Sequence, residues 1–358
     1  MPNSIINPDD PIMRALFLLT LSLLLSGQAR ALEVLTTIKP LQLIASAITD
    51  GGKAPELLLA PGTSPHDYAL RPSDVRRIKQ ADLVVWVGPE LEGFLTPLLE
   101  NQANSLALLA QINTDDHHPA PGQEHHDHAG HADHADHADH ADHADHADHA
   151  DHADHDDHSH RHHDKHDADN IAGDNDDDGH GHRHGELDTH IWLDPHHAEK
   201  IASLLAERLI QLDPSNHDLY QRNLAAFRAG LDETDRQVAE RLAATAGIGY
   251  FVFHDAYGYW EDHYQLASLG YFTVNPERAP GARTVSRIHK SLQQSQAQCV
   301  FAEPQFRPAV VEAVVRGTEA RIGILDPLGA DIKIGAQSYF TFMFQLANSM
   351  AVCLLNET

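Results

Sequence analysis

The sequence predicts an α/β protein of two lobes with mainly parallel sheets, joined by one long helix and interrupted by a disordered insert rich in histidine and aspartate. Three observations support this. The 358 residues, 42% of them hydrophobic, suffice for two packed domains. Short apolar runs alternate with helical stretches, which is typical of βαβ units and parallel sheets. The helical stretch 214–244, about 31 residues, would measure ~46 Å and could run the length of two lobes.

The strands and helices are expected in chain order. Strands are predicted where runs of Val, Ile, Leu and aromatic residues are bounded by Gly, Pro or Asp. These runs are Glu33–Ile38, Glu56–Leu59, Asp82–Val87, Gly249–Phe253, Gln298–Ala302 and Arg321–Leu325. The helical stretches between them include Ser73–Gln80, Thr284–Ala297 and Arg307–Gly317.

The long helix has recognisable signals at both ends. Asp213 can cap it, Pro214 suits its first turn, and Gly247 follows its end. Inside it, apolar residues recur at roughly helical spacing, at Leu219, Leu224, Phe227, Leu231, Val238 and Leu242. Gly230 is tolerable within a helix, but it leaves open the alternative of two shorter helices that meet there.

Residues 115–188 carry most of the negative charge. The whole chain has 53 acidic and 25 basic side chains, for a net charge of −28. This segment holds 23 acidic and 3 basic ones, a net of −20, which leaves −8 for the rest. It also holds 22 of the 30 histidines, and residues 131–154 repeat His-Ala-Asp eight times. A repeat of three residues places histidines on every face of a helix, so no apolar face forms that could pack. The segment also lacks Phe, Trp and Tyr and is highly charged, so we expect it to be disordered.

The N-terminus is typical of an export signal. The apolar run 15–25 is followed by Ala29-Arg30-Ala31, which fits a signal-peptidase site. We therefore expect residues 1–31 to be removed and Leu32 to begin a mature protein in a bacterial periplasm. A membrane anchor is the weaker alternative, because the run is shorter than the ~20 residues that span a bilayer. Met13 is an alternative start.

The remaining composition excludes several classes of protein. The acidity disfavours nucleic acid and anionic membranes as partners, because both bind basic patches. Two cysteines, Cys299 and Cys353, are too few for a disulfide-rich miniprotein or a cysteine-based zinc finger. The sequence contains neither a G-x-x-x-x-G-K-[ST] phosphate loop nor an H-E-x-x-H zinc-hydrolase motif.

Three of the eight histidines outside the insert adjoin apolar runs. His66 follows the run that ends at Leu59, His190 opens His-Ile-Trp-Leu, and His254 ends Tyr-Phe-Val-Phe-His. Asp326 follows a fourth run, 323–325. In open α/β sheets the carboxyl ends of strands face the ligand crevice, and three imidazoles with one carboxylate are typical of a mononuclear zinc site. The other histidines are expected to be solvated surface residues: His196, His197, His217, His263 and His289.

Several sequence blocks are specific when taken together. They are Pro-Gly-Thr-Ser-Pro-His-Asp-Tyr (61–68), Leu-Arg-Pro-Ser-Asp (70–74), Ala-Asp-Leu-Val-Val-Trp-Val-Gly-Pro-Glu-Leu-Glu (81–92), His-Ile-Trp-Leu-Asp-Pro (190–195), Phe-His-Asp-Ala-Tyr-Gly-Tyr (253–259), Ala-Glu-Pro-Gln-Phe (302–306) and Leu-Asp-Pro-Leu-Gly (325–329). In these blocks the chain resembles the periplasmic zinc-binding proteins of bacterial zinc ABC importers, the ZnuA type within the cluster A-I metal-binding family. The resemblance covers essentially the whole mature chain. It implies an N-terminal metal-binding lobe (32–212), a linking helix (213–246) and a C-terminal lobe (247–358), with the metal buried between the lobes.

The resemblance also implies the ligands of a zinc site. The family's three histidine ligands fall on His66, His190 and His254, and the aspartate that some relatives use as a fourth ligand falls on Asp326. Other zinc-specific members place a glutamate directly before the first histidine, where this chain has Pro65, so either Asp326 or a water completes the site. A histidine at position 254, where manganese-selective relatives commonly have glutamate, favours zinc, because manganese prefers oxygen ligands.

The function implied is that of a solute-binding protein, not an enzyme. It would capture Zn²⁺ with high affinity and deliver it, as a monomer, to an inner-membrane ABC permease served by a separate cytoplasmic ATPase. The insert would collect, buffer or sense zinc, or would be only a solvated acidic linker. The family further implies a disulfide between Cys299 and Cys353, with two buried thiols as the alternative. A zinc hydrolase with Glu303 as base, and a pure periplasmic zinc buffer, are the alternative functions.

Overall fold

The computed structural model describes residues 32–112, 187–277, 279–294, 296–306 and 309–357. The expected signal peptide and almost all of the expected disordered insert lie outside these residues. Within them, none of the helices combines the length and the apolar character needed to cross a membrane.

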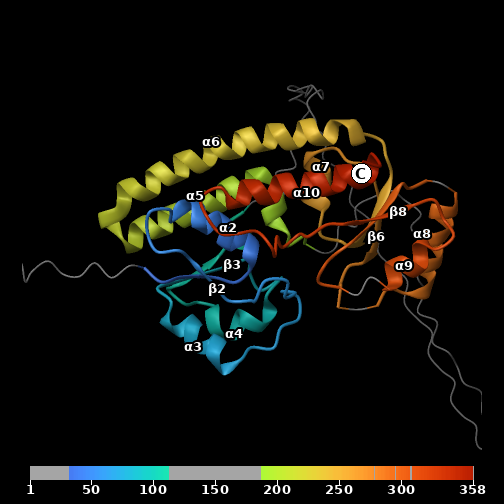
Figure 1. The fold of residues 1–358 in the computed structure, drawn as a ribbon. Coiled ribbons are helices and arrows are strands. Elements are labelled where there is room, and N and C mark those ends of the chain that lie inside the picture. Colours follow the sequence, from blue (N-terminus) through green and yellow to red (C-terminus); the bar gives the residue numbers. More distant parts are fainter. Residues whose placement is uncertain (1–31, 113–186, 278, 295, 307–308, 358) are drawn as a thin grey trace, which may run out of the picture. The chain divides into compact units, whose positions relative to one another are not determined.

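The N-terminal lobe contains a four-stranded parallel sheet in the order β2-β1-β3-β4. Its strands are β1 (Val34–Thr36), β2 (Glu56–Leu57), β3 (Leu83–Trp86) and β4 (Ser105–Ala107). The helices α2 (Lys39–Ile48), α3 (Pro72–Gln80) and α4 (Thr96–Leu99) alternate with them. Figure 1 shows α2 on one side of this sheet and α3 and α4 on the other.

The C-terminal lobe repeats the same strand order. Its parallel sheet runs β6-β5-β7-β8 and consists of β5 (Tyr250–His254), β6 (Ser268–Thr273), β7 (Cys299–Ala302) and β8 (Arg321–Ile324). The helices between the strands are α7 (Gly258–His263), α8 (Ala282–Gln293) and α9 (Ala309–Val315). In each sheet the first strand lies between the second and third, so the chain reverses direction across the sheet there. Such switch points are where open α/β sheets bind ligands.

The six strands expected from the sequence are all present, each within one or two residues of its predicted ends. Two strands, β4 and β6, were not expected. Both lie at sheet edges, and their exposed or half-exposed positions break the apolar pattern that marks the inner strands. This exposure explains why their sequences carry a weak strand signal, although two other edge strands, β2 and β8, were recognised.

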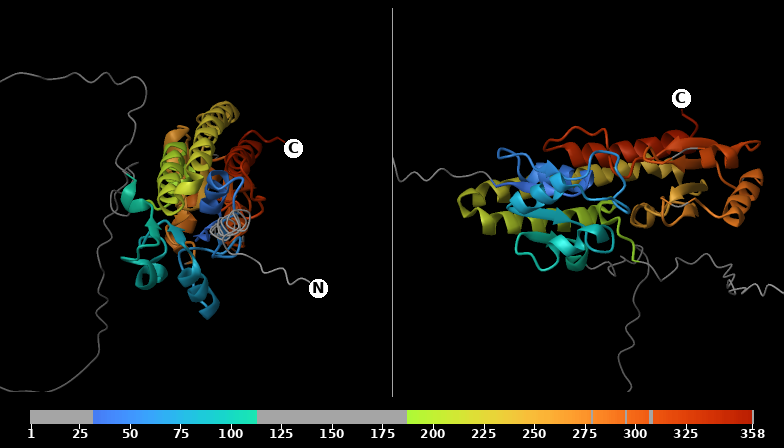
Figure 2. Two further views of the ribbon diagram at one scale, coloured as in Figure 1. Left: turned by 90° about the vertical axis from the view of Figure 1, so that its left-hand side faces the viewer. Right: turned by 90° about the horizontal axis from the view of Figure 1, so that it is seen from below.

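The long helix α6 (His217–Leu242) is continuous through Gly230, so the alternative of two shorter helices is wrong. It follows α5 (Pro195–Leu212), and the two run side by side (Figures 1 and 2). It also packs against α10 (Ser338–Leu354). A Cβ atom at Gly230 would lie 2.5 Å from the ring of Phe340 on α10, so a side chain here would clash. Glycine therefore allows the two helices to approach closely.

One hydrophobic core runs through both lobes. It includes Leu43 of α2, Trp192, Phe227 of α6, Val252 of β5 and Tyr339 of α10, and separate smaller clusters cover the outer face of each sheet. Residues alternate between the two faces along each strand, as the period of two requires.

Polar contacts join the same parts of the chain. Ser338 Oγ on α10 donates to Leu43 O at 3.3 Å, and Tyr339 Oη donates to Trp192 O at 2.7 Å. Trp192 Nε1 in turn donates to Pro327 O at 2.7 Å. A disulfide between Cys299 and Cys353 ties β7 to α10, as the resemblance implies. The last helix of the chain is therefore anchored to both lobes.

Candidate metal centre

Three histidines that are far apart in the sequence meet at the carboxyl side of the two sheets. His66 lies on the loop after β2, His190 directly precedes a 3-10 turn (Ile191–Leu193), and His254 is the last residue of β5. The ring centroids are 5.5 Å apart for His66 and His190, 5.0 Å for His66 and His254, and 4.9 Å for His190 and His254. Their candidate ligand nitrogens all lie within 4.8 Å of one another, and no other group of this kind occurs among the described residues.

The cavity between these histidines is small. His190 and His254 are 5% and 3% exposed, and His66 is half-buried. The cavity has about 10 Å³ of water-accessible volume, and its lining includes Trp192, Phe306 and Leu328. That volume is about what one water molecule needs, so the site suits a single small ion rather than an organic ligand.

His190 is oriented by a carboxylate two residues before it. Asp188 Oδ1 lies 2.8 Å from His190 Nδ1 and also accepts from the backbone N–H of His190 at 2.9 Å. His190 Nε2 is buried, and no described group bonds to it. A carboxylate behind a histidine fixes its ring orientation and tautomer and makes the other nitrogen a better metal ligand.

A second carboxylate stands behind His254. Glu303, 4% exposed, directly follows β7, and its Oε1 lies 3.4 Å from His254 Nδ1 and 3.4 Å from Tyr257 Oη. Both ring nitrogens of His254 are buried, and neither makes a hydrogen bond within the described residues. Glu303 approaches Nδ1, which leaves Nε2 for an ion and suits Glu303 to orient His254 rather than to act as a catalytic base.

Burial keeps two of the three imidazoles neutral. It lowers the pKa of His66 to about 3, with further lowering from the neighbouring His190 and His254. The pKa of His254 is also lowered, mainly by burial, although Glu303 partly offsets the effect. A histidine must be neutral to bind a metal, so His66 and His254 present unprotonated nitrogens across the physiological pH range.

Asp326, the candidate fourth ligand, is not grouped with the three histidines. Its Oδ1 accepts from Gln305 Nε2 at 2.6 Å and from the backbone N–H of Leu328 at 3.0 Å, and its Oδ2 accepts from the N–H of Ala330 at 2.7 Å. Hydrogen bonds to a charged group are worth about 1.5–3 kcal/mol each, so Asp326 is held firmly in its own turn.

The expectation that the other five histidines are solvated holds for His196 and His217, which are exposed, but His197 and His289 are half-buried. It is wrong most clearly for His263. Its Nε2 lies 2.9 Å from Asp235 Oδ1 on α6, and its Nδ1 lies 3.7 Å from Asp194 Oδ2 at the start of α5. Burial alone would lower the pKa of His263, but the hydrogen bond to Asp235 and the charges of both carboxylates raise it. The sequence around His263 indicates a helix. It does not show that α5 and α6 cover the side of that helix on which His263 lies.

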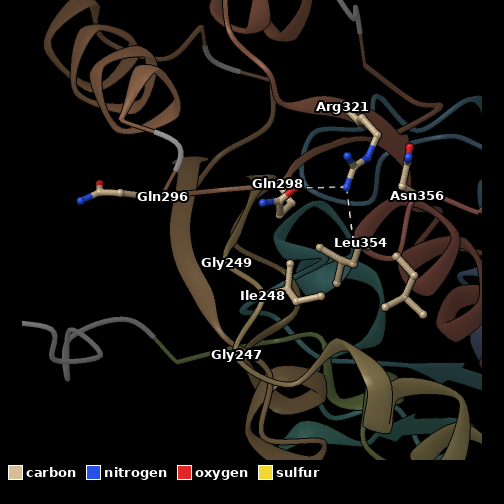
Figure 3. A pocket seen from close by; sticks show the side chains of 9 residues that line it. Gly247, Ile248, Gly249, Gln296, Gln298, Arg321, Leu354 and Asn356 are labelled. Carbon is tan, nitrogen blue, oxygen red and sulfur yellow. Dashed lines mark hydrogen bonds between the residues drawn. The ribbon is translucent and has the colours of Figure 1, made fainter.

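A much larger pocket, about 520 Å³, lies at the amino ends of β5, β7 and β8 (Figure 3). Gly249, Gln298 and Arg321 line it, and it contains no histidine. Arg321 Nε donates to Cys353 O at 2.9 Å, so this side chain satisfies a backbone carbonyl in the last turn of α10. Because ligands of open α/β sheets bind at the carboxyl ends of strands, the histidine cavity is the better candidate site despite its size.

Fold and site together define a two-lobed binding protein with a candidate metal centre between its sheets. The fold is that of the periplasmic zinc binding protein TroA from Treponema pallidum, with a TM-score of 0.65 and 17% identity over 91% of this chain and 99% of that one. Residues 34–353 match the family described as zinc-uptake complex component A, periplasmic (ZnuA), and the chain belongs to this family.

Curated relatives agree with this assignment. The high-affinity zinc uptake system protein ZnuA of Yersinia pestis is 42% identical over 333 residues, which cover 90% of this chain and 91% of the relative. The protein of the same name in Haemophilus influenzae is 43% identical over 323 residues, 90% of this chain and 93% of the relative. The family consists of binding components of transport systems and not of enzymes.

Proposed function

We propose that this protein captures Zn²⁺ with high affinity through His66, His190 and His254 and delivers it to a zinc importer. The observation that carries the proposal is the convergence of three imidazoles around a cavity the size of one ion, two of them with a buried Nε2 that no described group bonds to. Ligand nitrogens in a tetrahedral zinc site lie about 3.3–3.4 Å apart, which follows from Zn–N distances of 2.0–2.1 Å. The observed spread of up to 4.8 Å therefore needs only a small contraction.

The donor set favours zinc over the other common divalent ions. Three imidazoles suit Zn²⁺, whereas Mg²⁺, Ca²⁺ and Mn²⁺ prefer carboxylate and carbonyl oxygen. The carboxylates of Asp188 and Glu303 lie behind the histidines, where they offset the charge of the ion without binding it. Asp326 or a water supplies the fourth ligand.

The setting we propose follows the family. The chain is exported after cleavage behind Ala31, residues 32–212 and 247–358 form the two lobes, and residues 213–246 link them. The protein works as a monomer in the periplasm, and its partner is an inner-membrane ABC permease with a separate cytoplasmic ATPase. The His-rich segment 115–188 collects or senses zinc. The descriptions of the family and of its relatives as zinc uptake proteins support this proposal.

Single substitutions test the ligand set. His254→Ala should weaken zinc binding by more than ~100-fold, which exceeds the usual effect of losing a residue that only orients a ligand. Asp326→Ala should have a smaller effect, because water can replace a carboxylate ligand. Competition with a chelator of known affinity measures both. His217→Ala, an exposed histidine at the start of α6, is the matched control. Unchanged affinity in His254→Ala would refute the proposed site.

A further inference from the structure

We propose that Gln305 reserves the fourth zinc position for a water molecule, by holding Asp326 away from the ion and accepting a hydrogen bond from the bound water. This inference rests on the proposed function, because it assumes that zinc binds at His66, His190 and His254. It assigns Gln305 as a positioning residue and Asp326 as its partner instead of a ligand.

The two ends of the Gln305 amide face different surroundings. Its Nε2 donates to Asp326 Oδ1 at 2.6 Å, and because a carboxylate only accepts, this bond fixes which end of the amide carries the NH₂ group. The other end, Oε1, is buried, and no described group donates to it. Gln305 lines the same small cavity as the three histidines, whereas Asp326 does not. A residue that lines the cavity therefore carries one buried acceptor without a donor among the described residues.

The backbone around Gln305 fixes its position relative to the metal centre. Phe306 N donates to Glu303 O at 3.3 Å, which closes a tight turn with Gln305 inside it. Both ends of this turn contact His254, since Glu303 Oε1 lies 3.4 Å from His254 Nδ1 and the Phe306 ring packs edge-on against the imidazole at 6.3 Å between centroids. Gln305 is thus held in place by the same residues that orient a ligand.

A zinc-bound water satisfies every group at this position. The ion makes its water a strong hydrogen-bond donor, and Gln305 Oε1 is a buried acceptor that needs one. For Asp326 to bind zinc instead, its carboxylate would lose the bonds from Gln305, Leu328 and Ala330 and would leave Gln305 with neither partner. Asp326 does not line the cavity, so its carboxylate could reach the ion only if this turn rearranged.

The test compares three variants of the full chain loaded with Co²⁺, whose visible spectrum reports the ligands around the ion. Gln305→Met keeps the length of the side chain and removes both amide bonds. We expect it to release Asp326 onto the metal, which changes the cobalt spectrum and shows a carboxylate ligand in the crystal structure of the zinc-loaded variant. Asp326→Asn alone should keep the wild-type spectrum. Gln305→Met combined with Asp326→Asn should return to it.

Two results would overturn the inference. The first is a wild-type spectrum in Gln305→Met, which would show that Gln305 does not control the fourth position. The second is a changed spectrum in Asp326→Asn alone, which would show that Asp326 binds the metal in the wild-type protein. If Gln305→Met does not fold, Asp326→Asn still shows whether Asp326 binds the metal, and a changed spectrum there would overturn the inference. Failure of the proposed function looks different, because His254→Ala would then leave the wild-type cobalt spectrum and zinc affinity intact.

Discussion

Zinc binding to this protein should displace fewer protons than three ordinary histidines would. An ordinary histidine, with a pKa of ~6.5, is ~90% protonated at pH 5.5, so three of them would release ~2.7 protons for each zinc bound. The pKa of His66 is lowered to about 3, so this residue carries almost no proton at pH 5.5. At most two protons remain, and the lowered pKa of His254 reduces the number further.

The same difference sets how far affinity falls in acid. Between pH 7.5 and 5.5 the apparent affinity of a site with three ordinary histidines would fall ~1000-fold, because each imidazole contributes about tenfold. Without His66 the fall is ~100-fold, and the lowered pKa of His254 brings it below that value. The metal centre should therefore stay loaded at a pH where exposed histidines have lost their metal.

Calorimetry in buffers of different ionisation enthalpy counts the displaced protons directly. The protein for this experiment should lack residues 115–186, because the histidines of that segment would add protons of their own. The matched protein is His66→Ala in the same background, in which the proton count should not fall. A count near 2.7 in the parent protein, or a drop of about one proton in His66→Ala, would refute the reasoning from burial.

Four further predictions follow from the sequence and the contacts. Deletion of residues 115–186 should remove weak zinc binding and keep one tight site, which calorimetric titration would show; loss of the tight site would contradict the ligand assignment. Replacing Cys299 and Cys353 by Ser opens a loop of 54 residues and should lower the free energy of unfolding by about 4 kcal/mol in urea titration. His263→Gln should cost more stability at pH 6 than at pH 9. The pKa of His263 is raised in the folded protein, so its protonation stabilises the fold below ~6.5, and this stabilisation is lost as the pH rises through the folded pKa. Equal thermal shifts at the two pH values would argue against this. Gly230→Ala should lower the melting temperature despite its better helix propensity, because the new methyl group has to displace a packed ring.

Much of the fold could be predicted from the sequence because the inner strands and the long helix carry strong local patterns. The buried run of β5 and the recurring apolar residues of α6 need no tertiary information to be recognised. The edge strand β6 has no such pattern, because its half-exposed residues include Gly270. The shared core was not predictable either, since periodicity shows that a face is buried but not which element covers it.

The candidate site could be predicted in part for a similar reason. His66, His190 and His254 stand beside apolar runs, so the strand-end rule and the family blocks both pointed to them. Asp188, two residues from His190, could have been noticed as its partner from spacing alone. Glu303 could not, because only the parallel pairing of β5 and β7 brings it to His254. The hydrogen bond from Gln305 to Asp326 could not be predicted either, because it joins side chains 21 residues apart in the sequence.

The anchoring of α10 to both lobes limits how the protein can give up its cargo. Rotating the lobes apart about a hinge would break the bonds from Ser338 to Leu43 and from Tyr339 to Trp192 and would expose the core around them to water. We therefore expect release of the bound ion to begin with a local motion. Of the three histidines, His66 alone is partly exposed and lies on a loop rather than beside a strand or turn that packs into the core. We therefore expect that displacing this loop alone opens the site, while the rest of the protein stays folded.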